Sequence, residues 1–308
     1  MPDADKKNFR SGLVSIVGRP NVGKSTLLNT IVGEKISIVS KVPQTTRNQV
    51  RGIYTDERGQ IVFIDTPGFH KAKDKLGQFM YQSSTSVFHD VDCLIHLADT
   101  SRQVGEEEQI IVHCLNSTKV PIVLGLNKVD LKGKYLPEYI TLWEKTKGKS
   151  LTEMENFTLI ALSGKDEINI DKLLEILFNY LPQGEALYPL DTVCDVPQKM
   201  VIADIIREKL FGLMKEELPH SLGVAIEDMR PLSNKILNIK ALVLVERDSQ
   251  KEIVIGKKGD VLKRIGTQAR QELEGLLETK IFLELYVKVK KDWRNDPSFL
   301  EDLGLNYS

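Results

Sequence analysis

The chain has 308 residues and a hydrophobic fraction of 41%, which is enough for two globular domains with sizeable cores. Its net charge of −1 excludes a strongly basic or acidic protein but leaves a local nucleic-acid-binding surface open. Its three cysteines form no CxxC pair, no segment has the ~18 apolar residues of a membrane span, and the first ten residues lack the apolar core of a signal peptide, so we expect a cytoplasmic protein without disulfides or structural zinc.

Short apolar segments alternate with helical patterns between Gly12 and Pro182. Each segment is apolar on both faces and ends in polar residues, as buried parallel strands do. Helices are predicted over 24–32, ending at Gly33, and over 170–181, with Asn169 as the N-cap. The pattern predicts a doubly wound, mostly parallel α/β sheet. Its predicted strands are 13–17, 61–65, 93–99, 121–127 and 157–163, with 50–55 as a weaker edge strand.

A glycine-rich loop between the first strand and the first helix matches the phosphate-binding pattern GxxxxGK[ST]. Its amides would surround the phosphates, and the helix N-terminus would add positive potential. Lys24 would reach the terminal phosphates and act in catalysis, and Ser25 would bind Mg²⁺. The alternative is a plain glycine-rich turn. The predicted nucleotide-binding residues are Gly18, Arg19, Pro20, Asn21, Val22, Gly23, Lys24, Ser25 and Thr26.

Three further motifs close successive strands of the predicted sheet. Asp65-Thr66-Pro67-Gly68 would supply a carboxylate to the Mg²⁺ shell and the Gly68 amide to a γ-phosphate. Asn127-Lys128-Val129-Asp130 places a carboxylate where it would accept guanine N1–H and the N2 amine, which selects against adenine. Asn127 would brace the loops, and a backbone amide at Ser163-Gly164 would contact guanine O6. Together the motifs predict a GTP or GDP site.

With these motifs in place, residues 12–182 resemble the G domain of a TRAFAC-class GTPase, most similar to the Era family. The resemblance implies that Thr46, in the segment Thr45-Thr46-Arg47, contacts Mg²⁺ and the γ-phosphate in the GTP state. The implied metal ligands are therefore Ser25, Thr46 and Asp65, and the residues implied in hydrolysis are Lys24, Asn21, Thr46 and Gly68. The family usually has Ser-Ala where this chain has Ser163-Gly164, a change that a backbone contact tolerates.

The position after Gly68 holds Phe69, which has no polar group to orient water, so we predict slow intrinsic hydrolysis. His70 follows it; a lone loop histidine is expected to face solvent, and an approach to the γ-phosphate is the alternative. In related GTPases an Asn at the position of Asn21 helps bind K⁺, which would neutralise charge developing between the phosphates. We therefore hypothesise K⁺-stimulated hydrolysis, with a simple turn-forming role for Asn21 as the alternative.

Residues 183–197 hold two prolines, with Pro182 directly before them, and predict a linker. After it, the patterns predict a smaller α+β domain over 198–308, with residues 1–11 as a flexible N-terminus. Its alternating segment 281–290 predicts a half-buried strand of antiparallel type. The other predicted elements are a helix near 200–213, strands over 221–229 and 235–247, and a helix over 260–277.

A second glycine loop, Ile255-Gly256-Lys257-Lys258-Gly259, precedes the last of these helices and matches the KH signature GXXG. Its glycines would let the backbone approach a sugar-phosphate chain, and Lys257 and Lys258 would pair with phosphates. Segment 251–294 carries eleven Lys or Arg against seven Asp or Glu, which supports a polyanion partner. The predicted RNA-binding residues are Ile255, Gly256, Lys257, Lys258, Gly259, Lys263 and Arg264. A plain turn is the alternative.

The order of elements around this loop resembles a type II KH domain, and the segments Ile206–Lys209, Leu244–Arg247 and Glu284–Lys290 also resemble Era. The resemblance implies binding to the 3′ end of 16S ribosomal RNA, a role in assembly of the small ribosomal subunit, no DNA partner, a monomer, and peripheral association with the cytoplasmic face of the inner membrane. Two alternatives stay open: an RNA chaperone that uses GTP only structurally, and a related GTPase acting on tRNA or the large subunit.

Overall fold

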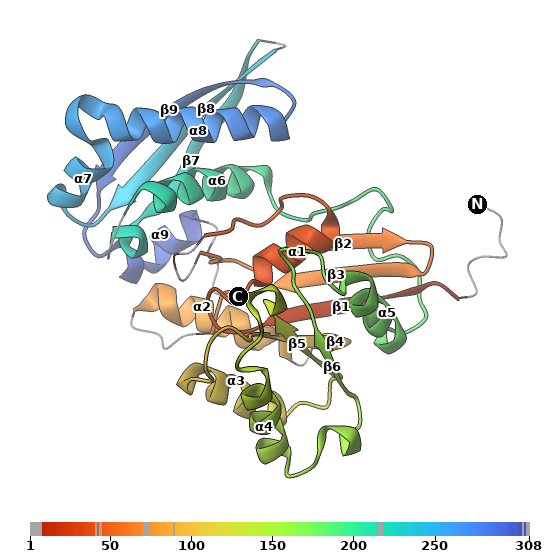
Figure 1. Cartoon of the computed structure of the whole chain (residues 1–308). Helices are drawn as coiled ribbons and strands as arrows, with labels where there is room; N and C mark the ends of the chain where they lie inside the picture. Colours follow the sequence, from red (N-terminus) through yellow and green to blue (C-terminus); the bar gives the residue numbers. More distant parts are fainter. Residues whose placement is uncertain are drawn as a thin grey trace. The chain divides into compact units, whose positions relative to one another are not determined.

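The computed structural model of the protein describes residues 8–40, 42, 45–69, 74–88, 90–214, 218–233, 235–303 and 305 (Figure 1). The chain forms two compact units. Unit 1 comprises residues 1–37, 46–71 and 80–195, and unit 2 comprises residues 38–45, 72–79 and 196–308. Two short segments from the N-terminal half of the sequence therefore belong with the C-terminal unit.

Unit 1 is built on a six-stranded sheet in the order β2-β3-β1-β4-β5-β6. β2 runs antiparallel to β3, and the other neighbours are parallel. The predicted doubly wound α/β fold is confirmed, and β3 and β4 are buried along their whole length, as expected for parallel strands covered on both faces. The strands are β1 (Arg10–Val17), β2 (Val50–Asp56), β3 (Gly59–Asp65), β4 (Cys93–Asp99), β5 (Ile122–Asn127) and β6 (Phe157–Ala161).

Five helices of this part of the chain connect the strands. The predicted helices near 24–32 and 170–181 are confirmed, the second ending one residue early, whereas the other three were not predicted. The expectation that Asn169 caps its helix with its side chain is wrong. Asn169 adopts a left-handed backbone (φ 59°), and its amide Nδ2 turns back to donate to the Ala161 carbonyl at 2.7 Å. The helices are α1 (Lys24–Val32), α2 (Lys75–Thr85), α3 (Glu106–Asn116), α4 (Leu136–Lys147) and α5 (Ile170–Tyr180).

Much of the predicted linker is fastened to unit 1. The Ile53 amide donates to the Val193 carbonyl at 2.9 Å, and the Asp195 amide donates to the Arg51 carbonyl at 3.2 Å. These bonds extend the sheet beyond its edge strand β2. Tyr188 and the buried side chain of Gln60 also exchange two hydrogen bonds, of 2.8 and 3.0 Å. We name residues 183–195 the strap.

Unit 2 contains the smaller α+β domain, in the predicted order of helix, two strands, GXXG between helices, and strand. Its sheet order is β7-β8-β9. The predicted antiparallel type of the last strand is wrong, because β9 pairs with β8 in parallel, as the intervening helical crossover requires. The elements are α6 (Gln198–Leu213), β7 (Gly223–Ser233), β8 (Ile236–Val245), α7 (Asp248–Ile255), α8 (Asp260–Leu276), β9 (Lys280–Val289) and α9 (Pro297–Asp302).

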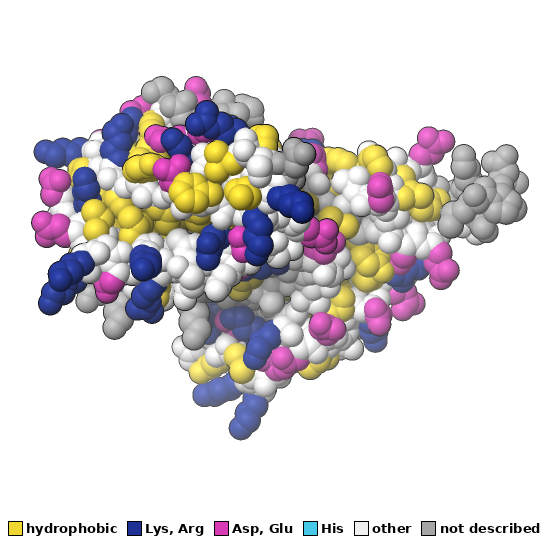
Figure 2. All heavy atoms as spheres, turned by 90° about the horizontal axis from the view of Figure 1, so that it is seen from above, with side chains coloured by type: hydrophobic (Ala, Val, Ile, Leu, Met, Phe, Trp, Pro, Cys, Tyr) yellow, Lys and Arg dark blue, Asp and Glu magenta, His cyan; other side chains and the backbone are white. Residues whose placement is uncertain are grey.

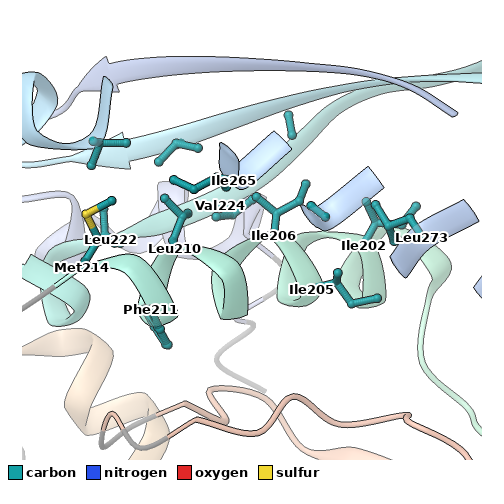
Figure 3. Close-up of a cluster of buried hydrophobic side chains, with 14 of the residues drawn as sticks. Ile202, Ile205, Ile206, Leu210, Phe211, Met214, Leu222, Val224, Ile265 and Leu273 are labelled. Carbon is teal, nitrogen blue, oxygen red and sulfur yellow. The ribbon is translucent and has the colours of Figure 1, made fainter. Parts of the chain in front are cut away.

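The core of unit 2 lies between its sheet and its helices. Ile202, Ile206 and Leu210 point from α6 toward the sheet and α8, where they join Ile265 and Leu273 (Figure 3). Each of these five side chains is fully buried. This packing fixes α8 on the sheet and so fixes the loop that precedes it, because the apolar side chains of α8 recur at helical spacing.

Candidate functional site

The first glycine loop joins the end of β1 to the start of α1, as predicted. Gly23 has a left-handed backbone (φ 105°), and a Cβ on it would lie only 2.5 Å from Nδ2 of Asn127. Asn21 also adopts a left-handed backbone (φ 64°). The loop therefore needs glycine at position 23 both for its backbone conformation and for the close approach of Asn127.

Lys24 lies under this loop with its side chain buried. Its Nζ donates to the carbonyls of Gly18 at 2.9 Å and Arg19 at 3.1 Å. Burial lowers the pKa of Lys24 to about 8, although the negative charges of Asp65 and Glu108 oppose that shift. The ammonium is thus held in the loop by backbone carbonyls, at the place where it would meet the phosphates of a nucleotide.

The three predicted metal ligands lie together. Ser25 Oγ donates to Asp65 Oδ2 at 2.6 Å and lies 3.0 Å from Thr46 Oγ1. Burial raises the pKa of Asp65, and the Lys24 charge opposes this shift. Asp65 Oδ1 is buried with no hydrogen-bond partner among the described residues. Two hydroxyls and an unsatisfied carboxylate oxygen are suitable ligands for Mg²⁺, which would also favour the charged form of Asp65.

Gly68 brings the DTPG segment against the phosphate loop. A Cβ at Gly68 would lie 2.8 Å from the backbone of Pro20, so a larger residue would push the two loops apart. The next amide, of Phe69, donates to the Gly18 carbonyl at 3.2 Å. The Phe69 ring is buried and packs against Phe88 and Tyr81, with centroids 5.8 and 5.4 Å away. Phe69 is thus a core residue, and His70 lies outside the described residues.

The NKxD segment follows β5 and ties several loops together. Asn127 Nδ2 donates to the Val22 carbonyl at 2.8 Å, and Asn127 Oδ1 accepts from the Gly164 amide at 3.0 Å, which confirms its predicted bracing role. Lys128 Nζ donates to the Asn21 carbonyl at 2.7 Å and to Asp99 Oδ2 at 2.8 Å. Asp99, at the end of β4, was missed from the sequence, where only its position at a strand end could have indicated it.

The predicted base-recognition residues Asp130 and Ser163 lie side by side. Ser163 Oγ donates to Asp130 Oδ1 at 2.6 Å, which orients the carboxylate. The Ser163 amide donates to the Ile168 carbonyl at 3.2 Å, so in this geometry it is not free for guanine O6, contrary to the expectation. The Gly164 amide is likewise used by Asn127. The carboxylate of Asp130 is partly exposed and available to a purine.

The second glycine loop is separate from these residues in the fold and connects α7 to α8 in unit 2. Gly256 (φ 74°), Lys258 (φ 54°) and Gly259 (φ 81°) all have positive φ angles. A Cβ at Gly256 would lie 2.4 Å from Val261 Cγ2, so only glycine fits there. Lys257 and Lys258 are exposed at the turn, and Lys263 and Arg264 are exposed on the following helix, whereas Ile255 is partly buried. The four cations therefore lie on one loop and the first turns of its helix.

On the face in Figure 2, Lys and Arg side chains lie among Asp and Glu side chains, with hydrophobic patches between them. Within the part of the chain that the structure describes, no group of three or more His, Cys, Asp or Glu residues could hold a metal ion. None of the described helices is both long and apolar enough to cross a membrane.

Comparisons with known proteins match two families to two separate parts of the chain. Residues 13–128 match the family of 50S ribosome-binding GTPases, and residues 217–294 match the KH domain. The GTPase Era of Halothermothrix orenii is 41% identical, covering 96% of this chain and 99% of its own length. The GTPase Era of Clostridioides difficile is 44% identical, covering 97% and 99%.

Two solved structures are similar over the same extent. A variant of Aquifex aeolicus Era bound to GDP and AlF₄⁻ gives a TM-score of 0.88 at 36% identity, covering 96% of this chain and 99% of that one. Era in complex with MgGDPNP and nucleotides 1506–1542 of 16S ribosomal RNA gives a TM-score of 0.89 at 36% identity, with the same coverage.

The lowered pKa of Lys24 predicts a pH-dependent nucleotide affinity. Bound phosphates would favour the charged ammonium, so binding takes up a proton and weakens as the pH rises through about 8. Between about pH 6.5 and pH 8.5 the dissociation constant for GDP should rise about fourfold. Calorimetry in buffers of different ionisation enthalpy measures both the affinity and the proton uptake. Equal affinities at the two pH values without proton uptake would contradict this assignment.

Proposed function

Because the chain belongs to the Era family of GTPases, we propose that it hydrolyses GTP with Mg²⁺ and binds the 3′ end of 16S ribosomal RNA through its KH domain during assembly of the small ribosomal subunit. The observation that carries this proposal is the similarity, over 96% of the chain, to Era in complex with MgGDPNP and 16S ribosomal RNA. The close approach of Ser25, Thr46 and Asp65 to one another supports GTP hydrolysis with Mg²⁺. The exposed lysines of the GXXG loop support RNA binding.

The residues of unit 1 divide the work of hydrolysis. Ser25, Thr46 and Asp65 would hold Mg²⁺, which supplies charge neutralisation between the β- and γ-phosphates when it is bound. Lys24 would leave the Gly18 and Arg19 carbonyls to contact the terminal phosphates. Gly68 lies beside the phosphate loop and would contact a γ-phosphate. Because the buried ring of Phe69 cannot orient water, the chain itself supplies little beyond positioning and electrostatics.

Unit 2 contains contacts that favour a link between nucleotide state and RNA binding. Arg207 of α6 donates to the Thr45 carbonyl at 2.9 Å, and Arg294 pairs with Asp74 at 3.1 Å. Thr45 directly precedes Thr46, which GTP would engage, and Asp74 lies six residues after Gly68. We therefore propose that GTP, by drawing Thr46 and Gly68 toward the γ-phosphate, changes how the segments 38–45 and 72–79 pack within unit 2.

Two alternatives differ from this proposal, one in the role of GTP and the other in the RNA that is bound. In the first, the protein is an RNA chaperone in which GTP is only a structural cofactor, and the buried Phe69 favours this alternative because it removes the usual water-orienting side chain. In the second, the KH domain binds tRNA or large-subunit RNA. Sequencing the RNA that crosslinks near Lys257 and Lys258 distinguishes the second alternative from the proposal.

Location and assembly are part of the proposal. We place the protein in the cytoplasm as a monomer, with peripheral contact between the basic residues near the GXXG loop and the anionic cytoplasmic face of the membrane. Cosedimentation with anionic and with neutral vesicles tests that contact. Equal binding to both vesicles would remove the membrane from the proposal.

Multiple-turnover phosphate release tests the enzymatic function. We expect catalytic turnover in the presence of Mg²⁺, on the order of 10⁻⁴ to 10⁻² s⁻¹, because no side chain orients the attacking water. Lys24→Ala should abolish turnover, whereas Lys119→Ala, a change of an exposed lysine in the same unit, should leave it unchanged. Release of at most one phosphate per protein would instead support the chaperone alternative.

Potassium stimulation is a separate prediction. If the Asn21 side chain helps bind K⁺ at the phosphates, hydrolysis should be at least about tenfold faster in K⁺ than in Na⁺, since the cation would replace part of an arginine finger. Asn21→Gly should remove that difference while preserving the left-handed backbone at φ 64°. Equal wild-type rates in the two salts would leave Asn21 with only its turn-forming role.

The GXXG loop predicts salt-sensitive RNA binding. Replacing both exposed lysines, in Lys257→Glu/Lys258→Glu, should raise the dissociation constant for an oligonucleotide of the 16S 3′ end by about tenfold or more. The slope of the logarithm of affinity against the logarithm of salt concentration should become shallower by about two, which corresponds to the loss of two phosphate contacts. Lys235→Glu, an exposed change elsewhere in unit 2, serves as the charge control. An unchanged affinity in the double variant would exclude the loop as the RNA clamp.

Coupling between the two activities predicts that the same oligonucleotide binds with different affinity in the GDP and GDPNP states, by about fivefold or more. Arg207→Lys, which retains the charge but cannot reproduce the guanidinium hydrogen bond to Thr45, should reduce the difference. Fluorescence anisotropy measures the affinity of the wild type and of Arg207→Lys for the oligonucleotide in each nucleotide state. Identical wild-type affinities in both nucleotide states would end the coupling proposal and leave the two binding activities intact.

A further inference from the structure

A buried row of polar side chains lies behind the phosphate loop. Glu108 of α3, His96 of β4 and Trp143 of α4 are each fully buried. His96 Nε2 lies 3.1 Å from Glu108 Oε2, and Trp143 Nε1 donates to His96 Nδ1 at 3.0 Å. On the side of the loop, Arg19 Nε lies 3.0 Å from Glu108 Oε1. These four residues come from four parts of the chain, and among them only Arg19 belongs to a nucleotide motif.

The Trp143 donor determines the state of the row. An indole N–H can only donate, so His96 Nδ1 must be the acceptor and the ring proton must lie on Nε2. Nε2–H then donates to Glu108 Oε2, which leaves Glu108 Oε1 facing the loop. The direction of both hydrogen bonds in the row is thus determined, and together they orient the Glu108 carboxylate toward Arg19.

The contact between Glu108 and Arg19 joins full opposite charges in a buried place. Glu108 lies in the first turn of α3, where the helix dipole favours a negative charge. The Arg19 side chain is 13% exposed. Since His96 is in its neutral form, Arg19 is the cation that directly contacts this carboxylate. Removing one member of such a pair is costly, because the other charge stays buried without compensation.

Arg19 is also held from a second direction, and through it the loop is tied at both ends. Arg19 Nη2 donates to the Tyr139 hydroxyl at 2.9 Å, and that hydroxyl donates to the Asp99 carbonyl at 2.9 Å. The Asp99 carboxylate accepts from Lys128, which also donates to the Asn21 carbonyl. Both Arg19 and Asn21 are therefore fixed to β4, α3 and α4 before any phosphate is bound.

From this geometry we propose that Glu108, oriented by His96 and Trp143, is a positioning residue for guanine-nucleotide binding. It acts through Arg19, holding the segment from Gly18 to Asn21 in the conformation that receives the phosphates. The proposal rests on nucleotide binding by this GTPase family and is independent of RNA. Fixing the loop in advance lowers the cost of ordering it on binding, so the effect falls on affinity more than on the chemical step.

The decisive variant is Glu108→Gln, which retains the size of the side chain and removes its charge. We expect the dissociation constant for GDP and the KM for GTP to rise about tenfold while kcat at saturating GTP stays within about twofold. The matched control is Glu106→Gln, which removes an exposed carboxylate from the same helical turn. The double variant Arg19→Gln/Glu108→Gln should lose less affinity than the two single variants together, because it leaves no buried charge unpaired.

A purely structural role would give different results. It would lower the thermal unfolding temperature of Glu108→Gln with an unchanged GDP affinity, or give additive losses in the double variant, and either result overturns the proposal. If Glu108→Gln does not fold, Trp143→Phe decides by the same measurements. It removes the N–H donor that orients His96, so a raised KM with preserved kcat supports the proposal, and an unchanged KM overturns it. Wild-type turnover in the same assay reports the GTPase activity separately.

Discussion

The side-chain amide of Asn127 is the contact on which the nucleotide loops depend. Its Nδ2 donates to the phosphate loop at Val22, and its Oδ1 accepts from the loop after β6 at Gly164. Both groups of one planar amide are used, so the spacing of these loops is fixed to within a hydrogen-bond length. Gly23 makes this contact possible, because a Cβ there would lie only 2.5 Å from Nδ2. One polar side chain at the end of β5 thus organises residues more than 100 positions apart in the sequence.

Sequence patterns predicted the parts of this protein that depend on local chemistry. Each motif at the end of a strand lies where parallel strands place it, and Ser25, Thr46 and Asp65 meet as expected, because parallel strands present their carboxyl ends at one edge. The helices α2, α3 and α4 were not predicted, although each buries apolar side chains along its length. The direction of β9 was also wrong, because alternation of side chains reports burial of one face and says nothing about the direction of the partner strand.

What the sequence could not indicate is mostly a matter of long-range pairing. The row from Arg19 to Trp143 joins residues up to 124 positions apart, and none of Glu108, His96 and Trp143 lies in a motif. A lone histidine in an apolar strand and a glutamate at a helix start each have ordinary structural explanations. The use of the Ser163 amide by Ile168, five residues further on, was also missed, since it depends on how the intervening turn closes. The role of these residues follows from their burial and from the direction of their hydrogen bonds, which only the fold shows.

The strap shortens the free segment of chain that precedes α6. Because residues up to Asp195 are bonded to the edge of the sheet and α6 begins at Gln198, only Val196 and Pro197 lie between the fastened segment and the first helix of the KH domain. Three successive residue steps span at most about 11 Å, and Pro197 restricts even that short piece. Thirteen of the fifteen residues predicted as a flexible linker therefore lie in the strap, and the freedom of backbone rotation before α6 is confined to Val196 and Pro197.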